Sequence, residues 1–247
     1  MTRSVVSLVV MARVPEQGRV KTRLQAVFSA PQVLALYRAM LRDTLELASG
    51  IPSRHVRTAV YWSGDRTAVP AEWAEAFPQF AHRLQRGVNL GERLLLSLGE
   101  WGGVGPVMAL GCDSPTLPAE YLARAVAWLR EERLPGEPEG CALPGTGPEI
   151  QPPDLVLGPS EDGGYYLIGM RTLVGALFEG IDWGTGKVLA QSLARARNCS
   201  LRTCLLPEWH DLDTVEDLAK VAERRAVAHG SGRHIHRCLT ELGIPNV

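Results

Sequence analysis

The chain has 247 residues, of which 45% are hydrophobic, so it is long enough to bury a substantial core. Its formal net charge of −1 argues against broad electrostatic binding to nucleic acid or to an anionic membrane. The apolar run at the start is too short for a membrane-spanning helix and does not suit a signal peptide. The five cysteines form no CxxC pair, which favours reduced thiols and a cytoplasmic protein.

Short apolar runs alternate with longer segments of helical period along the chain. Strands are expected at residues 4–10, 57–62, 80–85, 106–111, 154–158, 165–170 and 200–206. Helices are expected at residues 31–48, 90–101, 119–132, 186–198 and 214–228. This rhythm predicts one α/β domain over residues 1–247, with a mostly parallel sheet between helices. A Pro/Gly-rich loop is expected at about 133–153, and a C-terminal tail from about 226.

Positive charge is concentrated in "ARVPEQGRVKTR", the loop after the first expected strand. It contains Arg13, Arg19, Lys21 and Arg23, together with Gly18. A glycine-containing loop between a strand and a helix can present backbone N–H groups to phosphate. The loop therefore favours a phosphate cradle, with Lys21 and Arg23 as its main cations, although a solvated basic loop would look similar. The spacing GxxxxGK[ST] is absent, so the loop is not a Walker A motif.

Acidic residues follow two later strands. Asp113 comes directly after "PVMAL", at the edge where open α/β sheets bind ligands. Mg²⁺ or Mn²⁺ bridging phosphate oxygens needs hard carboxylate ligands on a rigid support. Asp211 and Asp213 in "HDLDTVEDL" have strand-like spacing and could complete such a site. Alternatively, Asp113 only forms a turn, and Asp213 caps the next helix, which makes Asp211 the better ligand of that pair.

The stretch "GPSEDGGYYLIG" combines two acids with two adjacent glycines. Gly163 and Gly164 would let an acceptor approach the backbone closely. Asp162 could orient or deprotonate an acceptor hydroxyl, with Glu161 as the second candidate. A hairpin turn that needs Asp-Gly only for its geometry is the alternative.

The stretch "LQRGVNLGERL" places Gln85 at a strand end and Gly91 at a helix start. The Gln85 amide could read the edge of a nucleotide base, and Gly91 could let the base lie against the backbone. A polar strand end followed by an ordinary helix start is the alternative.

Six stretches together resemble one known family: "RVPEQGRVKTRL", "QRGVNLGER", "GCDSPTL", "GPSEDGGYYLIG", "WGT" and "HDLDTVEDL". In this order, from Val5 to about Val221, they are similar to the bacterial nucleotide-diphospho-sugar transferase-like proteins called transferase 1, associated with radical-SAM and selenodomain neighbours. Molybdenum-cofactor nucleotidylyltransferases and phospholactate guanylyltransferases are similar more distantly. The chain departs from the family pattern at Arg13, where Lys is usual, at Gly184, where Ser is usual, and at Leu212, where Val is usual.

The resemblance implies a three-layer α/β/α fold of the glycosyltransferase-A-like type. It also implies a nucleoside diphosphate held through Mg²⁺ or Mn²⁺, with Asp113 as the metal-binding acid. The expected function is metal-dependent glycosyl transfer from a nucleoside-diphosphate sugar to an unknown small-molecule acceptor. One alternative is nucleotidyl transfer from a nucleoside triphosphate with release of pyrophosphate. The other is a non-catalytic nucleotide-binding module, toward which Gly184 points.

Overall fold

The chain folds around one sheet. The computed structural model describes residues 4–64, 68–132, 152–223 and 231–243. Its strands are β1 (Val6–Arg13), β2 (Val56–Ser63), β3 (Ala81–Leu84), β4 (Val107–Gly111), β5 (Leu155–Pro159), β6 (Tyr165–Met170) and β7 (Thr203–Leu205). Their spatial order is β3-β2-β1-β4-β6-β5-β7. Of these described strands only β6 is antiparallel to its neighbours, which confirms the predicted mostly parallel sheet.

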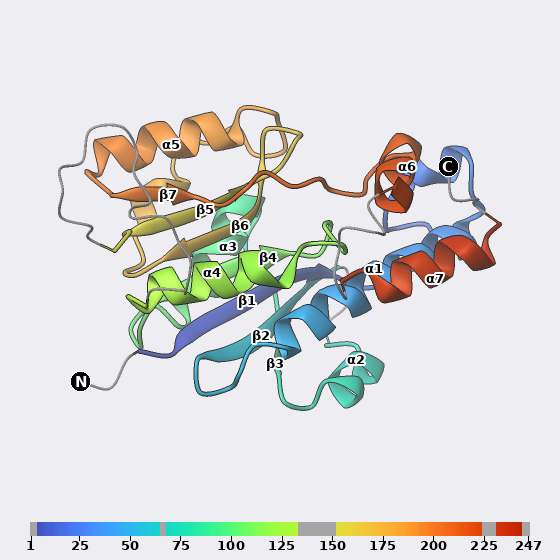
Figure 1. The fold of residues 1–247 in the computed structure, drawn as a ribbon, viewed down its shortest axis with the longest axis horizontal. Coiled ribbons are helices and arrows are strands. Elements are labelled where there is room, and N and C mark those ends of the chain that lie inside the picture. Colours follow the sequence, from blue (N-terminus) through green and yellow to red (C-terminus); the bar gives the residue numbers. More distant parts are fainter. Residues whose placement is uncertain (1–3, 65–67, 133–151, 224–230, 244–247) are drawn as a thin grey trace.

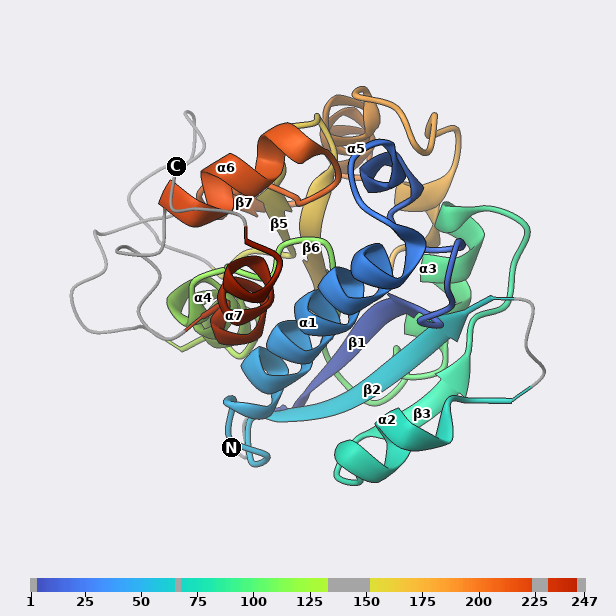
Figure 2. The same cartoon turned by 90° about the vertical axis from the view of Figure 1, so that its right-hand side faces the viewer.

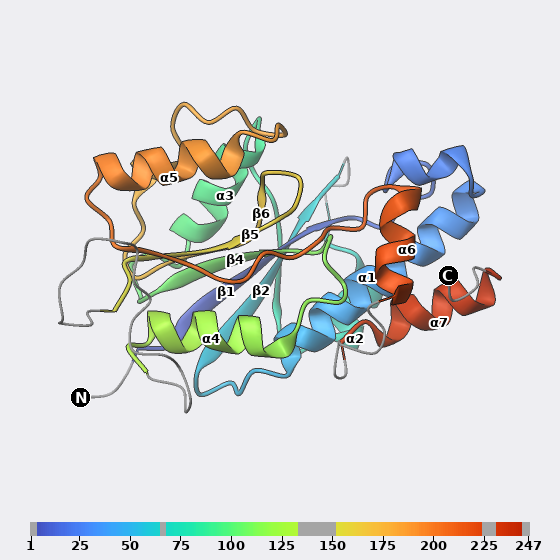
Figure 3. The same cartoon turned by 45° about the horizontal axis from the view of Figure 1, so that its top comes forward.

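Helices cover both faces of the sheet and give three layers (Figure 3). One face carries α1 (Ala30–Ser49), α2 (Ala71–Ala76) and α4 (Ala119–Leu129). The other carries α3 (Leu90–Gly99), α5 (Val188–Asn198) and the 3-10 helix η2 (Gly175–Phe178). A third apolar cluster joins α1 to η1 (Thr22–Ala26), α6 (Val215–Glu223) and α7 (Arg233–Glu241).

Burial on both faces explains the composition of the central strands. Val6, Leu8, Val9 and Val10 of β1 are each 0% exposed, so β1 shows a continuous apolar run rather than alternation. The helices show the apolar stripe that packing on one face requires. In α1, for example, buried residues recur at three-and-four spacing along its length. The sheet therefore forms the middle layer, and its strand ends are the part left for binding.

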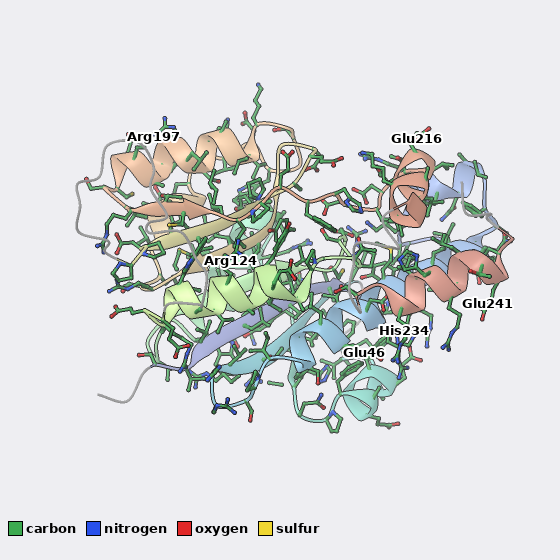
Figure 4. All side chains as sticks on the ribbon, in the orientation of Figure 1. Glu46, Arg124, Arg197, Glu216, His234 and Glu241 are labelled. Carbon is green, nitrogen blue, oxygen red and sulfur yellow. The ribbon has the colours of Figure 1, made fainter. Side chains whose placement is uncertain are left out.

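The C-terminal segment forms a helix, so the expected tail from about residue 226 is wrong for residues 233–241. α7 lies alongside α1 (Figure 1), with Ile235 and Leu239 buried between them. The buried carboxylate of Asp43 in α1 accepts hydrogen bonds from the backbone N–H groups of His234 (2.9 Å) and Ile235 (2.8 Å). Figure 4 shows His234 beside Glu46, and their side chains are 2.9 Å apart. The acid that caps α7 is Asp43 of α1, so the sequence around residue 233 does not contain the capping residue that would predict the helix.

Three further expectations concern regions around the core. The Pro/Gly-rich loop expected at about 133–153 falls outside the described residues except for its last two. Cys112, Cys199 and Cys238 are free, but Cys204 is disulfide-bonded, so the expectation of reduced thiols throughout is wrong. Sequence spacing misses a pairing of that kind, because it depends on which segments meet in space. Within the described residues, no helix has the length and apolar character needed to cross a membrane.

Candidate functional site

The carboxyl ends of the central parallel strands open onto a pocket of about 450 Å³. In open α/β sheets this edge is where ligands bind. The pocket receives residues from the ends of β1 and β4, the loop after β1, the first turn of α3 and the start of β6. It brings together the predicted residues Arg13, Lys21, Arg23, Gln85, Asp113 and Asp213. The other predicted residues lie outside its lining: Gly18, Gly91, Glu161, Asp162, Gly163, Gly164 and Asp211.

Five positively charged side chains line this pocket. They are Arg13, Arg19, Lys21, Arg23 and Arg93. Sequence reasoning missed Arg93, whose Nε donates a hydrogen bond to the carbonyl of Gly87 (3.1 Å). Its available signal is its place in the first turn of a helix that begins at the binding edge. This number of cations suits a ligand that carries several negative charges.

Tyr37 of α1 holds the backbone of Arg13, the first of these cationic residues. Its hydroxyl accepts a hydrogen bond from the backbone N–H of Arg13 (2.8 Å) and donates one to the Arg13 carbonyl (2.9 Å). Burial raises the pKa of Tyr37, so the hydroxyl keeps the proton that it donates. Gly18 has a φ of 78°, in the left-handed region, and shapes the turn of the basic loop rather than the pocket wall.

Lys21 connects the basic loop to the acidic side of the pocket. Its Nζ contacts the carboxylates of Asp113 and Asp213, the latter at 2.5 Å. The side chain is only 6% exposed. Burial alone lowers the pKa of Lys21, but the two carboxylates outweigh burial and the pKa is raised. The backbone of Lys21 is left-handed (φ 42°), which costs about 1–2 kcal/mol, so the ion pairs offset strain in the loop.

Backbone hydrogen bonds hold the two acidic segments next to each other. The N–H of Leu212 donates to the carbonyl of Asp113 (2.8 Å), which ties the segment after β4 to residues 211–213. Asp217 in α6 accepts a hydrogen bond from the backbone N–H of Asp213 (3.0 Å). Asp213 is therefore fixed facing Lys21 and Asp113 by contacts that its own side chain does not supply.

Asp211 does not line the pocket, although Asp113 and Asp213 do. Its Oδ1 accepts a hydrogen bond from the Ser114 hydroxyl (2.5 Å). Burial is the main cause that raises the pKa of Asp211 to about 7, and the charges of Asp113 and Asp162 raise it further. Asp211 therefore keeps its proton to a higher pH than an exposed aspartate does. The effect also shows that Asp113, Asp162 and Asp211 lie within electrostatic range of one another.

The pocket fits a divalent cation that arrives with phosphate. Among the described residues, no three carboxylate, imidazole or thiol groups gather closely enough to hold a metal by themselves. Mg²⁺ in nucleotide sites is commonly held by one or two carboxylates together with substrate phosphates. Asp113 and Asp213, with side chains 48% and 41% exposed, provide that smaller set. The Mg²⁺ or Mn²⁺ cofactor remains a prediction.

Gln85 presents an acceptor to the pocket. Its Nε2 donates to the backbone carbonyls of Ala12 (3.1 Å) and Tyr61 (2.8 Å), which leaves Oε1 available to a ligand. Gly91 lies outside the lining. A Cβ on Gly91 would come within 2.2 Å of the Trp183 indole nitrogen, so the glycine allows Trp183 to pack on the start of α3. The role of Gly91 in base binding remains a prediction.

The turn between β5 and β6 holds the predicted catalytic acids. Oδ1 of Asp162 accepts hydrogen bonds from the Ser160 hydroxyl (2.6 Å) and the Gly164 N–H (2.9 Å). Glu161 instead pairs with Lys220 of α6 at 2.6 Å. Because Glu161 is engaged in an ion pair, Asp162 is the better placed of the two for acid–base chemistry.

The same turn depends on a glycine. Gly163 has a φ of 84°, and a Cβ there would lie 2.2 Å from the carbonyl oxygen of Gly186. Gly184 has a similar φ of 80° but open space around it. Gly184→Ala should lower the free energy of unfolding by about 1–2 kcal/mol through backbone strain alone. Gly163→Ala should lower the free energy of unfolding by about 1–3 kcal/mol more, because the added Cβ would clash with Gly186 and the turn would have to shift.

Urea unfolding of both variants measures this difference, since the two glycines share a backbone conformation and differ in surroundings. Equal losses would show that the turn accommodates the added Cβ beside Gly186 without cost.

Several proteins of known structure share this arrangement of strands. The chain is similar to the structure of a proposed nucleotide-diphospho-sugar transferase from Desulfovibrio desulfuricans G20, with a TM-score of 0.80 and 28% identity over 97% of this chain and 96% of that one. An inositol-1-phosphate CTP transferase from T. maritima shares the fold (TM-score 0.55, 13% identity, 97% and 98% covered). So does a 4-diphosphocytidyl-2C-methyl-D-erythritol synthase (TM-score 0.51, 14% identity, 90% and 97% covered). The chain therefore has the nucleotide-diphospho-sugar transferase-like fold.

The chain belongs to the family described as "Uncharacterized protein conserved in bacteria (DUF2064)", whose model matches residues 47–185. No curated protein matches its sequence. The matched segment contains Gln85, Asp113 and Asp162, whereas Lys21 and Asp213 lie outside it. The pocket is thus completed by segments on both sides of the family match.

Proposed function

We propose that the protein is a metal-dependent transferase that moves a glycosyl group from a nucleoside-diphosphate sugar to a small acceptor. The observation that carries this proposal is the composition of one pocket. Cations from the first loop and α3 line the same pocket as Asp113 and Asp213 at the carboxyl ends of the strands. A diphosphate with a divalent cation matches both sides of that pocket. The likeness to the D. desulfuricans protein, proposed to be a nucleotide-diphospho-sugar transferase, supports the same assignment.

The donor would lie across the pocket. Arg13, Lys21 and Arg23 would neutralise the phosphates, and the Gln85 carbonyl would accept a hydrogen bond from the base. Arg93 joins the phosphate-binding set by its position in the lining. Preorganisation matters here because charge develops on the departing diphosphate, and fixed cations stabilise it without rearranging.

Asp113 and Asp213 would hold Mg²⁺ or Mn²⁺, with Asp211 behind them as a further acid. A divalent cation bound there supplies Lewis-acid stabilisation of the leaving diphosphate. The Leu212 N–H, which donates to the Asp113 carbonyl, and the Asp217 carboxylate, which accepts from the Asp213 N–H, hold the backbone around the two acids.

The acceptor would approach over the turn between β5 and β6. Asp162 would orient its hydroxyl and take its proton, while Gly163 and Gly164 leave room beside the backbone. Ser160 and the Gly164 N–H hold Oδ1 of Asp162 and so fix the direction of its carboxylate.

Nucleotidyl transfer from a nucleoside triphosphate is the second candidate. Five cationic side chains and two carboxylates line the pocket, so its net positive charge could also serve a triphosphate. In that reaction the acceptor attacks the α-phosphate and pyrophosphate leaves.

The released product distinguishes the two reactions. The protein is incubated with Mn²⁺, an acceptor panel and either nucleoside-diphosphate sugars or nucleoside triphosphates, and the products are separated by ion-exchange chromatography. Nucleoside diphosphate supports glycosyl transfer, whereas pyrophosphate supports nucleotidyl transfer. Mn²⁺-dependent binding without turnover of any donor would contradict both and leave a nucleotide-binding module.

A further inference from the structure

Lys21 is the buried cation at the centre of the acidic pair. Its Nζ contacts Oδ1 of Asp113 and Oδ1 of Asp213 together, and its side chain is 6% exposed. A metal ion that bridges these two aspartates through the same oxygens would have to replace the ammonium. The ammonium and a divalent cation would also repel each other at such short range. Lysine and metal therefore compete for the space between the two carboxylates.

Lys21 also lines the pocket beside Arg13 and Arg23, the other cations expected to meet phosphate. Its flexible four-carbon stem lets a compact ammonium change partners without moving the backbone. A buried ammonium leaves its carboxylates readily only when another anion replaces them, because an unpaired buried charge is strongly unfavourable. Phosphate oxygens delivered into the same pocket provide that replacement.

We infer that Lys21 makes metal binding conditional on the nucleotide: its ammonium occupies the Asp113–Asp213 pair in the free protein and transfers to the phosphates when the donor binds. This inference rests on the proposed metal-dependent function. The free protein then binds Mn²⁺ weakly, because the lysine already neutralises the ligands. Donor and metal assist each other's binding, since a coupling between two ligands acts equally in both directions.

Mn²⁺ binding without nucleotide tests the inference. Electron paramagnetic resonance of free Mn²⁺ gives the dissociation constant for wild-type protein, for Lys21→Gln and for Arg23→Gln. The Arg23→Gln control removes one positive charge from the same pocket and leaves Asp113 and Asp213 paired with Lys21. We expect Lys21→Gln to bind Mn²⁺ about tenfold more tightly than wild type or better, and Arg23→Gln to stay within about threefold of wild type. Equal affinities for Lys21→Gln and wild type would overturn the inference.

A second measurement needs no substitution and so does not depend on the variant's folding. Mn²⁺ binding to wild-type protein is compared with and without a mixture of UDP, GDP, CDP and ADP, corrected for the nucleotides' own affinity for Mn²⁺. The inference predicts a Mn²⁺ affinity at least about tenfold higher with the mixture. Tight Mn²⁺ binding that the mixture leaves unchanged would contradict the inference but not a metal-dependent transferase. No Mn²⁺ binding in any protein, with or without nucleotide, would overturn the proposed function itself.

Discussion

Asp113→Ala should abolish the Mn²⁺-dependent part of the rise in Tm that nucleotides produce. It should also lower the transfer rate by about 10²–10³-fold, the range seen when one group that stabilises developing charge is removed. The physical reason is the loss of a cation ligand on a rigid strand end. The fold should persist, because the contact that Asp113 makes with Leu212 uses the backbone carbonyl and Lys21 keeps Asp213 as its partner.

A thermal-shift screen of nucleotides and nucleotide sugars, each with and without Mn²⁺, measures the binding part of this prediction, because ligands that bind the folded state raise Tm by mass action. Glu120→Ala is the matched control. It removes one negative charge from the first turn of α4, close along the chain, from a residue that does not line the pocket. An Mn²⁺-dependent shift that survives in Asp113→Ala would remove Asp113 from the mechanism.

Asp211→Asn should make the metal-free protein more stable at pH 8 than wild type. Burial raises the pKa of the Asp211 carboxyl from 3.8 to about 7, so the folded state binds a proton that the unfolded state has released. The contribution of Asp211 to the free energy of unfolding therefore falls as pH rises from about 4 to about 7 and stays low above that range. A difference of about 3 pKa units corresponds to at most about 4 kcal/mol. Asparagine carries no charge and can still accept the Ser114 hydrogen bond.

Urea unfolding in EDTA at pH 5, 6, 7 and 8 tests this prediction. The advantage of Asp211→Asn over wild type should grow across the series. Ser114→Ala serves as the control, because it keeps the carboxylate and removes a hydrogen bond that lowers the pKa of Asp211, so its loss of stability with rising pH should persist and extend to higher pH than in wild type. A constant difference between Asp211→Asn and wild type at all four pH values would show that Asp211 ionises as freely as an exposed acid.

The parallel part of the fold follows from the sequence because buried strands and amphipathic helices have different periods. The continuous apolar run of β1 and the three-and-four spacing in α1 are local features, and both elements form where they are expected. The place of β6 between β4 and β5 is not local. It depends on which strand edges remain open after the others have paired, and the order of strands in the chain does not contain that information.

The sequence predicts most of the residue types in the site, but it does not predict which of those residues contact one another. Reading the residues after each strand brings Arg13, Gln85 and Asp113 to one edge, where the structure places them. Lys21 and Asp213 are 192 residues apart, so their ion pair is a product of tertiary folding. The strand-like spacing of Asp211 and Asp213 does not bring both into the pocket, because residues 211–213 are not in a strand and only Asp213 lines the pocket.

The position of a bound metal would show whether Asp113 and Asp213 hold it. Figure 2 shows the carboxyl end of β1 and the loop that follows it beside α1. Crystals of the protein are soaked with Mn²⁺ and the nucleoside diphosphate that gives the largest thermal shift, and anomalous scattering locates the manganese. We expect manganese between Asp113, Asp213 and the diphosphate, with the Lys21 ammonium on a phosphate oxygen. Manganese and nucleotide bound elsewhere, with Lys21 still between its two aspartates, would contradict this expectation.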